Sequence, residues 1–334
     1  MNKVKFVDLF AGIGGFHLAL KNTNSECVFA SEWDKKCQEV YEKNFNIKPY
    51  GDITLINAKD IPSHDFLCAG FPCQAFSISG KRLGFDETRG TLFFDVVRVV
   101  KFHKPKVVFL ENVKNFLTHD NGKTINVVRS TLEKLNYNIF YSILNSSDYG
   151  VPQSRARIYI VAFRKDLNIK KFLFPKRIYK SISLIDYLLP DELTKELVIN
   201  RKDIFLKENI KIQKDMFGFY PQKPVRLGHV NKGGQGERIY SPLGHSIALT
   251  AYGGGVGSKT GLYLINKKIR KLAPRECARI SGFPDSFLIH ENKSACYKQF
   301  GNSVVVDVVR LVIEKIFQTG CLNKGSENFL KKTG

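Results

Sequence analysis

The sequence has no C-x-x-C pair and no apolar run approaching the ~18 residues of a membrane span. Its cysteines number seven, an odd count, which argues against both a disulfide framework and a thiolate zinc site. The opening residues 1–6 run directly into a strand-like segment and show no targeting peptide. We therefore expect a cytoplasmic protein with no metal and no membrane partner.

Acidic residues are also scarce relative to basic ones. Lys and Arg total 52 against 31 for Asp and Glu, which gives a formal net charge of +21. A surface this basic favours a polyanionic partner, and nucleic acid is the first candidate. A basic surface that serves only solubility is the alternative. The 334 residues are enough for a large core and for two domains.

The first half of the chain alternates strand-like and helical segments. Helical patterns begin near residues 14, 35, 92 and 124, between strand-like runs at 4–10, 27–31, 66–69, 107–110 and 158–163. This alternation predicts an α/β fold with a largely parallel sheet covered by helices. After about residue 183 the sequence becomes polar, lysine-rich and then glycine-rich, which predicts a second, smaller domain rich in loops. Helical patterns return at 274–280 and 304–317.

A thiol and a carboxylate each follow a strand-like run. Cys73 comes after run 65–69, and Pro72 with the polar residues that follow places the sulfur in a loop. Glu111 comes after run 106–110. Ligands of parallel sheets bind beyond the carboxyl ends of the strands, so the two groups are predicted to share a cleft. The alternatives are a packed cysteine, which suits Cys68, and a solvated boundary glutamate.

A glycine turn follows the first strand-like run. Gly12 and Gly14 come after Phe10 at the start of a helix, where glycine lets backbone approach a ligand closely. The spacing is G-x-G-G, so the dinucleotide fingerprint is incomplete. Glu32 ends the second run, where a carboxylate can accept hydrogen bonds from ribose hydroxyls. The pattern predicts a nucleoside-containing cofactor but gives no reason to expect nicotinamide.

Two further residues could contact the base of such a cofactor. Trp33 could cover an adenine ring, with simple packing as its alternative. Asp52, after Gly51, could bind the adenine amino group, with an ordinary turn aspartate as its alternative.

Six sequence blocks occur in an order that is specific to one family. They are Asp8–Gly12, Gly70–Gln74, Glu111–Val113, Gln153–Arg157, Arg275–Arg279 and Gln299–Ser303. On these blocks the chain resembles the DNA cytosine-5 methyltransferases over nearly its whole length. The resemblance implies a Rossmann-like methyltransferase sheet that uses S-adenosyl-L-methionine and a smaller target-recognition domain that binds double-stranded DNA. We predict a catalytic and cofactor-binding domain at 1–185, a target-recognition domain at 186–273, and helices at 274–334 that return to the first domain.

The resemblance assigns roles to the reactive residues. Cys73 would add its thiolate to C6 of cytosine, and Glu111 would hold N3 and the exocyclic amine. Arg157 would bind O2, with Arg155 supporting the same site. Taken alone, two arginines before an apolar run are more often a solvated strand start. The cofactor-side residues would be Phe10, Gly12, Gly14, Glu32, Trp33, Asp52, Ile53, Pro72, Leu92 and Asn302.

Chemistry on a stacked base requires that the target cytosine be flipped out of the duplex. By resemblance Gln235 and Ser79 would fill the gap, and Arg238 would contact a guanine. The other DNA contacts would be Lys232, Tyr252, Gly254, Gly255 and Lys259. Ala248 stands where the family usually has threonine, so this position offers no hydroxyl group to a phosphate.

The recognition loops resemble those of enzymes that act within GCGC. The implied role is the modification half of a restriction system, with a cognate restriction endonuclease that forms no direct complex and with a monomeric methyltransferase. An RNA cytosine-5 methyltransferase and an inactive DNA-binding methyltransferase fold are the competing hypotheses. The presence of Cys73, Glu111 and Arg157 favours an active enzyme.

Overall fold

The structure is a computed structural model that describes residues 3–72, 92–178, 180–208 and 210–322. The chain divides into two compact units. Unit 1 consists of Met1–Leu144, Ala156–Pro175 and Val309–Gly334, and unit 2 of Asn145–Arg155 and Lys176–Val308. Each unit is assembled from segments that are distant in the sequence. The three-part division at 185 and 273, which follows changes in composition, stays a prediction.

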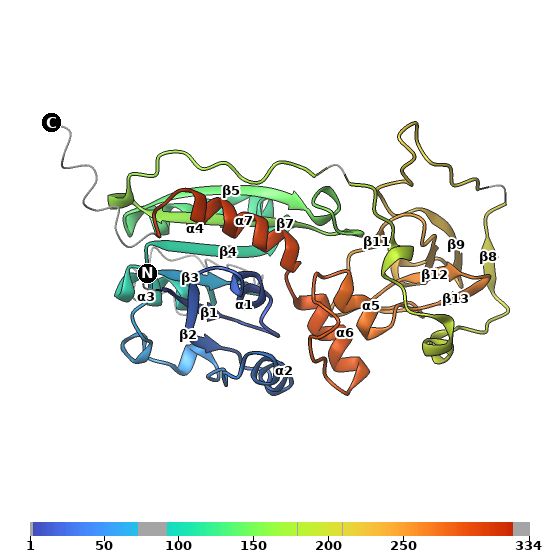
Figure 1. The fold of residues 1–334 in the computed structure, drawn as a ribbon, viewed down its shortest axis with the longest axis horizontal. Helices are drawn as coiled ribbons and strands as arrows, with labels where there is room; N and C mark the ends of the chain where they lie inside the picture. The colour runs from blue at the N-terminus through green and yellow to red at the C-terminus, as the bar shows by residue number, and fades with distance from the viewer. Residues whose placement is uncertain (1–2, 73–91, 179, 209, 323–334) are drawn as a thin grey trace. The chain divides into compact units, whose positions relative to one another are not determined.

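Unit 1 is built on a six-stranded sheet with the order β2-β1-β3-β4-β7-β5 (Figure 1). β1 pairs in parallel with β2 and β3, and β3 pairs in parallel with β4. β7 is antiparallel to β4. The predicted α/β fold is confirmed, with β7 as the exception to the parallel arrangement. The strands are β1 Val4–Leu9, β2 Ser25–Ser31, β3 Phe66–Ala69, β4 Val107–Val113, β5 Tyr137–Asn145 and β7 Ala156–Arg164.

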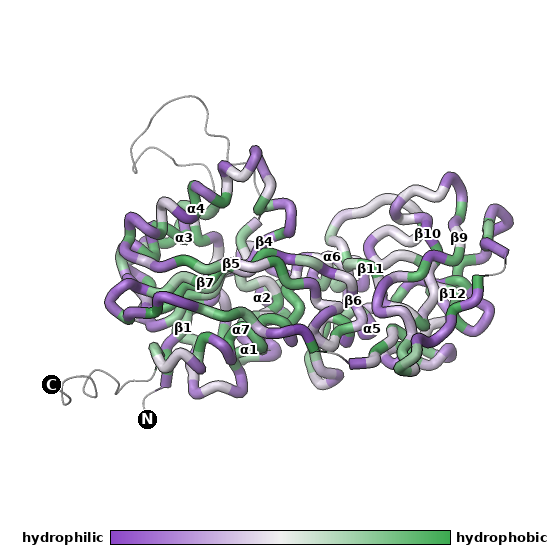
Figure 2. Tube along the Cα trace, turned by 90° about the horizontal axis from the view of Figure 1, so that it is seen from above, coloured by the Kyte–Doolittle hydropathy of each residue, from purple (hydrophilic) through white to green (hydrophobic). Residues whose placement is uncertain are grey.

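Helices cover both faces of this sheet, which explains why its strands are nearly continuous apolar runs. Val108 and Leu110 of β4 belong to one core cluster with side chains of α3 and α4. On the other face, Phe16 of α1 packs edge-on against Phe109 with ring centroids 5.3 Å apart. Figure 2 shows hydrophobic residues along β4 and β7. The helices of this unit are α1 Gly15–Leu20, α2 Lys35–Phe45, α3 Leu92–His103, α4 Lys123–Lys134 and α7 Val306–Gln318, which unit 1 includes from Val309 onward.

Strand β4 is longer than its apolar run. The sequence placed Glu111 at the end of a strand that stops at Leu110, but pairing with β7 continues as far as Val113 opposite Arg157. Backbone pairing extends the strand through polar residues that hydrophobic periodicity cannot detect. Glu111 therefore lies inside β4 and is only 8% exposed. The solvated-boundary alternative is wrong.

Unit 2 contains a five-stranded sheet with the order β13-β12-β10-β9-β8 and a two-stranded pair, β11-β6. Val230, Ile239, Leu262 and Ile269 form the core of the larger sheet. Its strands are three to five residues long, too short to show a period of two, so the sequence predicted loops here. The elements are β6 Gln153–Ser154, β8 Ile204–Leu206, β9 Arg226–Val230, β10 Arg238–Tyr240, β11 Ser246–Ile247, β12 Leu262–Ile265, β13 Lys268–Arg270, α5 Pro274–Arg279 and α6 Lys293–Asn302.

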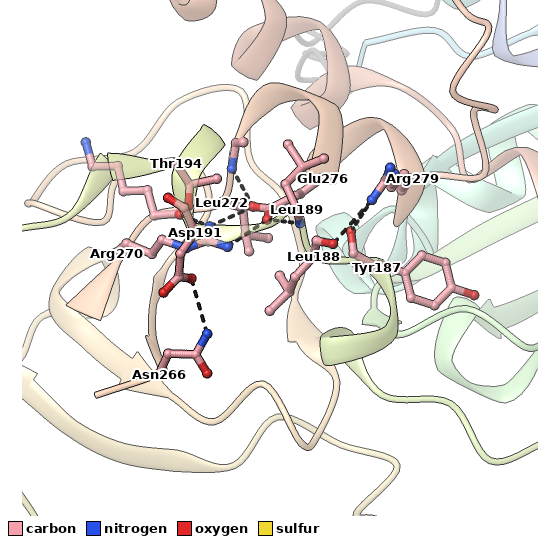
Figure 3. Close-up of polar contacts among 12 residues, drawn as sticks. Tyr187, Leu188, Leu189, Asp191, Thr194, Asn266, Arg270, Leu272, Glu276 and Arg279 are labelled. Atoms are coloured by element: carbon pink, nitrogen blue, oxygen red, sulfur yellow. Dashed lines mark hydrogen bonds and ion pairs between the residues drawn. The ribbon is translucent and has the colours of Figure 1, made fainter. Parts of the chain in front are cut away.

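A buried ion pair ties β13 to α5 in unit 2 (Figure 3). The guanidinium of Arg270 donates to both carboxylate oxygens of Glu276 at 2.7 and 2.8 Å, and the two residues are 1% and 0% exposed. Glu276 also accepts from the backbone N–H groups of Leu189 and Ala273, each at 2.7 Å. Removing one partner of such a pair leaves a buried charge uncompensated, at a typical cost of about 3–5 kcal/mol. The pair therefore links three chain segments, and neither charge can be removed without leaving the other unpaired.

Across the part of the chain that the structure describes, no helix is long and apolar enough to cross a membrane. Within the same residues no group of three or more His, Cys, Asp or Glu side chains could hold a metal ion.

Candidate active site and recognition segment

Glu111 and Arg157 form an ion pair in unit 1, with Oε1 and Nε 3.2 Å apart. Glu111 lies opposite Tyr159 in the β4–β7 ladder and Val113 lies opposite Arg157. The two side chains therefore occupy diagonal positions on the same face of the sheet. The side chains of Glu111 and Arg157 alone are 10% and 17% exposed, so water screens their attraction only weakly. The solvated-strand alternative for Arg157 is wrong.

The other carboxylate oxygen of Glu111 lies on the side of the turn that follows β3. A Cβ built on Gly70 would lie 3.8 Å from Glu111 Oε2, within ordinary van der Waals contact. Glu111 Oε2 therefore lies next to the turn that begins at Gly70.

Asn112 supports the same turn from the opposite face of β4. Its Nδ2 donates to the carbonyl of Phe71 at 2.9 Å, and its Oδ1 accepts from Val113 N at 2.8 Å. Asn112 is 2% exposed. The chain is thus fixed directly before Pro72. The sequence shows Asn112 only as a member of a block, and its only signal there is an amide at the end of a strand. The predicted residues Cys73 and Ser79 lie outside the described residues.

Glu32 connects the end of β2 to the glycine turn after β1. Its Oε2 accepts from Gly12 N at 2.9 Å and its Oε1 from Asp34 N at 2.8 Å. Burial raises the pKa of Glu32, and the N–H donors of Asp34 and Gly12 oppose that shift. Each carboxylate oxygen has a second lone pair, so these bonds leave capacity for ribose hydroxyls.

The two glycines of the turn, Gly12 and Gly14, differ in their surroundings. At Gly12, with φ +54°, a Cβ would meet no atom within 4 Å, so the backbone there faces open space. Gly14, at φ +86°, would place a Cβ 2.2 Å from the Phe45 ring of α2. Phe10 also adopts a positive φ, 55°. An open backbone beside a carboxylate at a helix start fits a nucleoside cofactor of the predicted kind.

The remaining predicted cofactor-side residues are spread over both units. Trp33 is 71% exposed, so the packing alternative is wrong and an indole face is available. Asp52 caps the 3-10 turn Ile53–Leu55 by accepting from Thr54 N at 2.9 Å, and Ile53 is buried. Leu92, half-buried, begins α3. Pro72 is exposed, and Asn302 is the exposed last residue of α6 in unit 2.

Arg155 belongs to unit 2, whereas Glu111 and Arg157 belong to unit 1. Its Nη1 donates to the carbonyl of Leu249 at 2.8 Å, and its Nη2 to those of Gly301 and Ser303 at 3.0 and 2.8 Å. Arg155 is 4% exposed, so it is not a solvated strand residue. The three carbonyl groups that accept from Arg155 all belong to unit 2.

The predicted DNA-contact residues of unit 2 are mostly accessible. Lys232 and Gln235 are exposed, and Tyr252 is 77% exposed. Arg238 begins β10 and is half-buried; its Nε has no hydrogen-bond partner among the residues described. Lys259 Nζ donates to the carbonyl of Ser294 at 3.3 Å.

The two glycine-rich segments 233–236 and 253–257 lie against each other. Gly257 N donates to the carbonyl of Gly236 at 2.7 Å. A Cβ on Gly236 would lie 1.9 Å from the carbonyl oxygen of Gly254, and Gly255 adopts φ +83°. Only glycine allows this approach, so the structure brings the segments of Gln235 and Gly254 together.

The sheet of unit 1, with its glycine turn, strand-end carboxylate and acid–arginine pair, fits the Rossmann-like fold expected of an S-adenosylmethionine-dependent methyltransferase. Comparison with protein families then makes the assignment specific. The chain belongs to the C-5 cytosine-specific DNA methylase family, whose model matches residues 4–318, and it is a DNA (cytosine-5-)-methyltransferase.

Individual relatives agree with this assignment. The chain is 56% identical to Type II methyltransferase M.HhaI of Haemophilus parahaemolyticus, over 94% of each chain. It is 41% identical to Type II methyltransferase M.HpaII of Haemophilus parainfluenzae, over 95% of this chain and 90% of the relative. Among solved structures, the S. pombe Dnmt2 methyltransferase matches with a TM-score of 0.69 at 22% identity, covering 95% of this chain and 99% of that one. The last comparison shows the shared fold alone.

Proposed function

We propose that the enzyme methylates C5 of a cytosine flipped out of duplex DNA, within GCGC, as the modification half of a restriction system. The observation that carries the proposal is the Glu111–Arg157 pair beside Gly70, at the turn that Asn112 fixes directly before Pro72 and Cys73. An acid and a cation on the same face of the sheet can together form hydrogen bonds with the donors and acceptors along one edge of a single base. The target rests on the resemblance of segments 233–241 and 251–255 to GCGC recognition loops.

Glu32, Trp33 and the turn at Gly12 would hold the cofactor. S-adenosylmethionine supplies an electrophilic methyl group when bound. Glu32, which accepts from Gly12 N, would also accept from the ribose hydroxyls, the open backbone of Gly12 would pass close to the ligand, and the exposed indole of Trp33 would cover the adenine. Phe10, Gly14, Asp52 and Ile53 shape the same end of the sheet.

The chemical steps follow from the poor nucleophilicity of cytosine C5. The Cys73 thiolate would form a bond to C6, and the electrons of the C5–C6 double bond would become available at C5 to bond to the methyl group. The bond between that methyl group and the sulfonium sulfur would break, and its electrons would stay on sulfur as a neutral thioether. Glu111 holds N3 and the exocyclic amine and stabilises the charge that develops on the ring. Arg157 donates to O2. A base then removes the C5 proton, and the C6–sulfur bond breaks to restore the ring and the thiolate.

The arrangement of unit 2 supports a role in reading DNA. Gln235 is exposed and would fill the gap left by the flipped base, together with Ser79. The Arg238 guanidinium would contact a guanine O6/N7 pair, a contact worth about 1–3 kcal/mol of discrimination. Lys232 and Lys259 would contact phosphates, and the glycines at 254 and 255 would let backbone approach the groove. A monomer suffices for one flipped base, and no complex with the cognate endonuclease is needed.

The test of the chemistry uses duplex DNA and labelled cofactor. The wild-type enzyme is expected to label cytosine C5 and to form a covalent adduct with DNA that contains 5-fluorocytosine. Cys73→Ala is expected to do neither, and Glu111→Gln to lose about 10²–10⁴-fold in rate. The control is Cys37→Ser, on α2, which should keep full activity. Full activity of Cys73→Ala would refute the mechanism.

Substrate class and target are tested separately. Transfer RNA offered as the methyl acceptor distinguishes an RNA enzyme, and a DNA-binding module would form no adduct with either acceptor. Base-resolution mapping of methylated DNA should find label at GCGC. Continued cutting of GCGC by a cognate nuclease after saturating treatment would refute the target but leave the chemistry intact.

A further inference from the structure

We propose that Arg155, with Gln153 and Gly301, acts as a positioning device for the DNA-recognition segment rather than as a contact to the reacting cytosine. We call these three residues the recognition clamp. The proposal rests on the DNA-contact role proposed above for Tyr252, Gly254 and Gly255. All the contacts that carry it lie within unit 2.

The clamp begins where a short β-ladder ends. β11 pairs with β6 through only two positions, Ser246 with Gln153 and Ile247 with Ser154. Beyond these two positions, the hydrogen bonds to the backbone come from side chains instead of from a neighbouring strand. Leu249 N donates to Gln153 Oε1 at 3.1 Å, and Leu249 O accepts from Arg155 Nη1 at 2.8 Å. Both backbone polar groups of Leu249 are therefore satisfied by buried side chains.

The same two side chains reach other parts of unit 2. Gln153 Nε2 donates to the carbonyl of Ile280, which follows α5, at 2.9 Å. Arg155 Nη2 donates to the carbonyls of Gly301 and Ser303 at the end of α6. Gln153 is 0% exposed and Arg155 is 4% exposed, so water cannot replace either set of bonds. One buried cluster thus joins the chain at Leu249 to the ends of two helices.

Gly301 completes the clamp by close packing. A Cβ built there would lie 2.3 Å from Ala251 N and 2.3 Å from the carbonyl carbon of Thr250. Both are backbone atoms that cannot rotate away. The peptide between Thr250 and Ala251 is therefore pressed against α6, and any side chain at 301 would displace it.

This geometry fixes the backbone directly before the recognition loop. Tyr252 follows the clamped peptide and is 77% exposed. The chain then continues to Gly257, whose N–H holds the carbonyl of Gly236 in the other glycine-rich segment. Hydrogen bonds and close backbone packing therefore form a path from Arg155, through segment 249–257, to the loop that carries Gln235. Because recognition groups must be held to within about 0.5 Å, loosening this path should weaken discrimination before it weakens chemistry.

Arg155→Lys is the direct test, because a lysine cannot reproduce the planar fork that serves three carbonyls. The substrates are a duplex with the target mapped for the wild-type enzyme and duplexes in which one base pair of that target is replaced. We expect the variant to lose about tenfold in discrimination through KM, with the single-turnover rate at saturating DNA changed less than about threefold. A large fall in that saturated rate with discrimination intact would show that Arg155 acts on cytosine, and would overturn the proposal.

Hydrogen exchange provides a local readout that does not depend on activity. Peptides covering 248–255 should exchange faster in the variant, while peptides of β1, β3 and β4 should not change. Unchanged exchange at 248–255 in a folded variant would also overturn the clamp. The exchange measurement can be interpreted even if the wild-type enzyme fails to methylate duplex DNA. Such a failure would refute the proposed function but would not test the clamp.

Gln153→Met keeps the side-chain volume and leaves Arg155 in place, so it serves where Arg155→Lys fails to fold. It should give the same pattern, since it removes the partner of Leu249 N. Arg279→Lys is the matched control. Arg279 also donates to backbone carbonyls in unit 2, those of Tyr187 and Leu188 at 3.3 Å, but has no contact with segment 248–255 among its described hydrogen bonds. Equal loss of discrimination in the control would mean that the effect is not specific to the clamp, and would overturn the proposal.

Discussion

Asp8 is a fully buried carboxylic acid on β1, opposite Cys68 of β3 and Ala30 of β2. Burial raises the pKa of Asp8 well above its ordinary value, and the nearby charge of Glu32 raises it further. The folded protein therefore holds a proton on Asp8 over a pH range in which the unfolded chain has lost it. Stability from this group is complete below the unfolded pKa, near ~3.9, and falls as the pH rises toward the folded pKa.

Replacing Asp8 with asparagine should remove this dependence. Compared with wild type, Asp8→Asn is expected to gain stability as the pH rises above the unfolded pKa of about 3.9, by up to about 1.4 kcal/mol per pH unit, until Asp8 of the folded wild type ionises. Denaturant unfolding at several pH values measures the difference. The control is Asp60→Asn, at an exposed aspartate in the turn Ala58–Asp60, which separates the effect of the buried site from that of an Asp→Asn change itself. A constant difference between Asp8→Asn and wild type over the whole range would contradict the prediction.

At the scale of elements, the turn between β1 and α1 combines a ligand surface with a packing contact. Gly14 N donates to Ala11 O, and Ala11 N donates to Ser31 O of β2. The Phe45 ring that faces Gly14 stacks on His17, with centroids 4.0 Å apart, and cannot move freely. The turn is therefore rigid on its α2 side and open at Gly12.

Alanine at the two glycines should separate these properties. Both positions have positive φ, which costs roughly 1–2 kcal/mol for an L-residue. Gly14→Ala adds a clash with Phe45 and should lower stability by about a further 1–3 kcal/mol. Gly12→Ala should mainly weaken S-adenosylmethionine binding, because its methyl group enters the open space. Thermal melting and calorimetric titration test both, and equal effects of the two changes on both quantities would be the contrary result.

At the scale of the whole molecule, the formal net charge of +21 predicts binding to DNA that depends strongly on salt. Each phosphate contact contributes about −0.9 to the slope of log K against log salt concentration. Basic residues occur in both units, but the slope depends only on the number of phosphates that the protein contacts. Replacing a lysine should therefore change the slope only if that lysine contacts a phosphate.

Lys232→Ala should therefore reduce the steepness of this slope by about one unit and weaken binding equally for target and non-target duplexes. Lys59→Ala, at an exposed lysine of unit 1, is the control and should leave the slope unchanged. Fluorescence anisotropy over a series of salt concentrations measures both. An unchanged slope for Lys232→Ala would show that this lysine does not contact phosphate.

The sequence alone determined the α/β fold, the family and the residue types of the site. Apolar runs and helical periods are local, and the blocks around Gly12, Gly70, Glu111 and Arg157 are short and distinctive. The sheet of unit 2 was not predicted, because strands of three to five residues carry too few positions for a period to show. Strand β5 was also missed.

Only the tertiary structure decided which of these residues belong together. The antiparallel pairing of β7 with β4 places Arg157 beside Glu111, and nothing local in either segment encodes that register. Arg155, only two residues away, instead reaches Leu249 and Gly301, which are about a hundred residues or more distant in the chain. A side chain's hydrogen-bond partners depend on long-range packing, so neighbours in the sequence acquired separate roles.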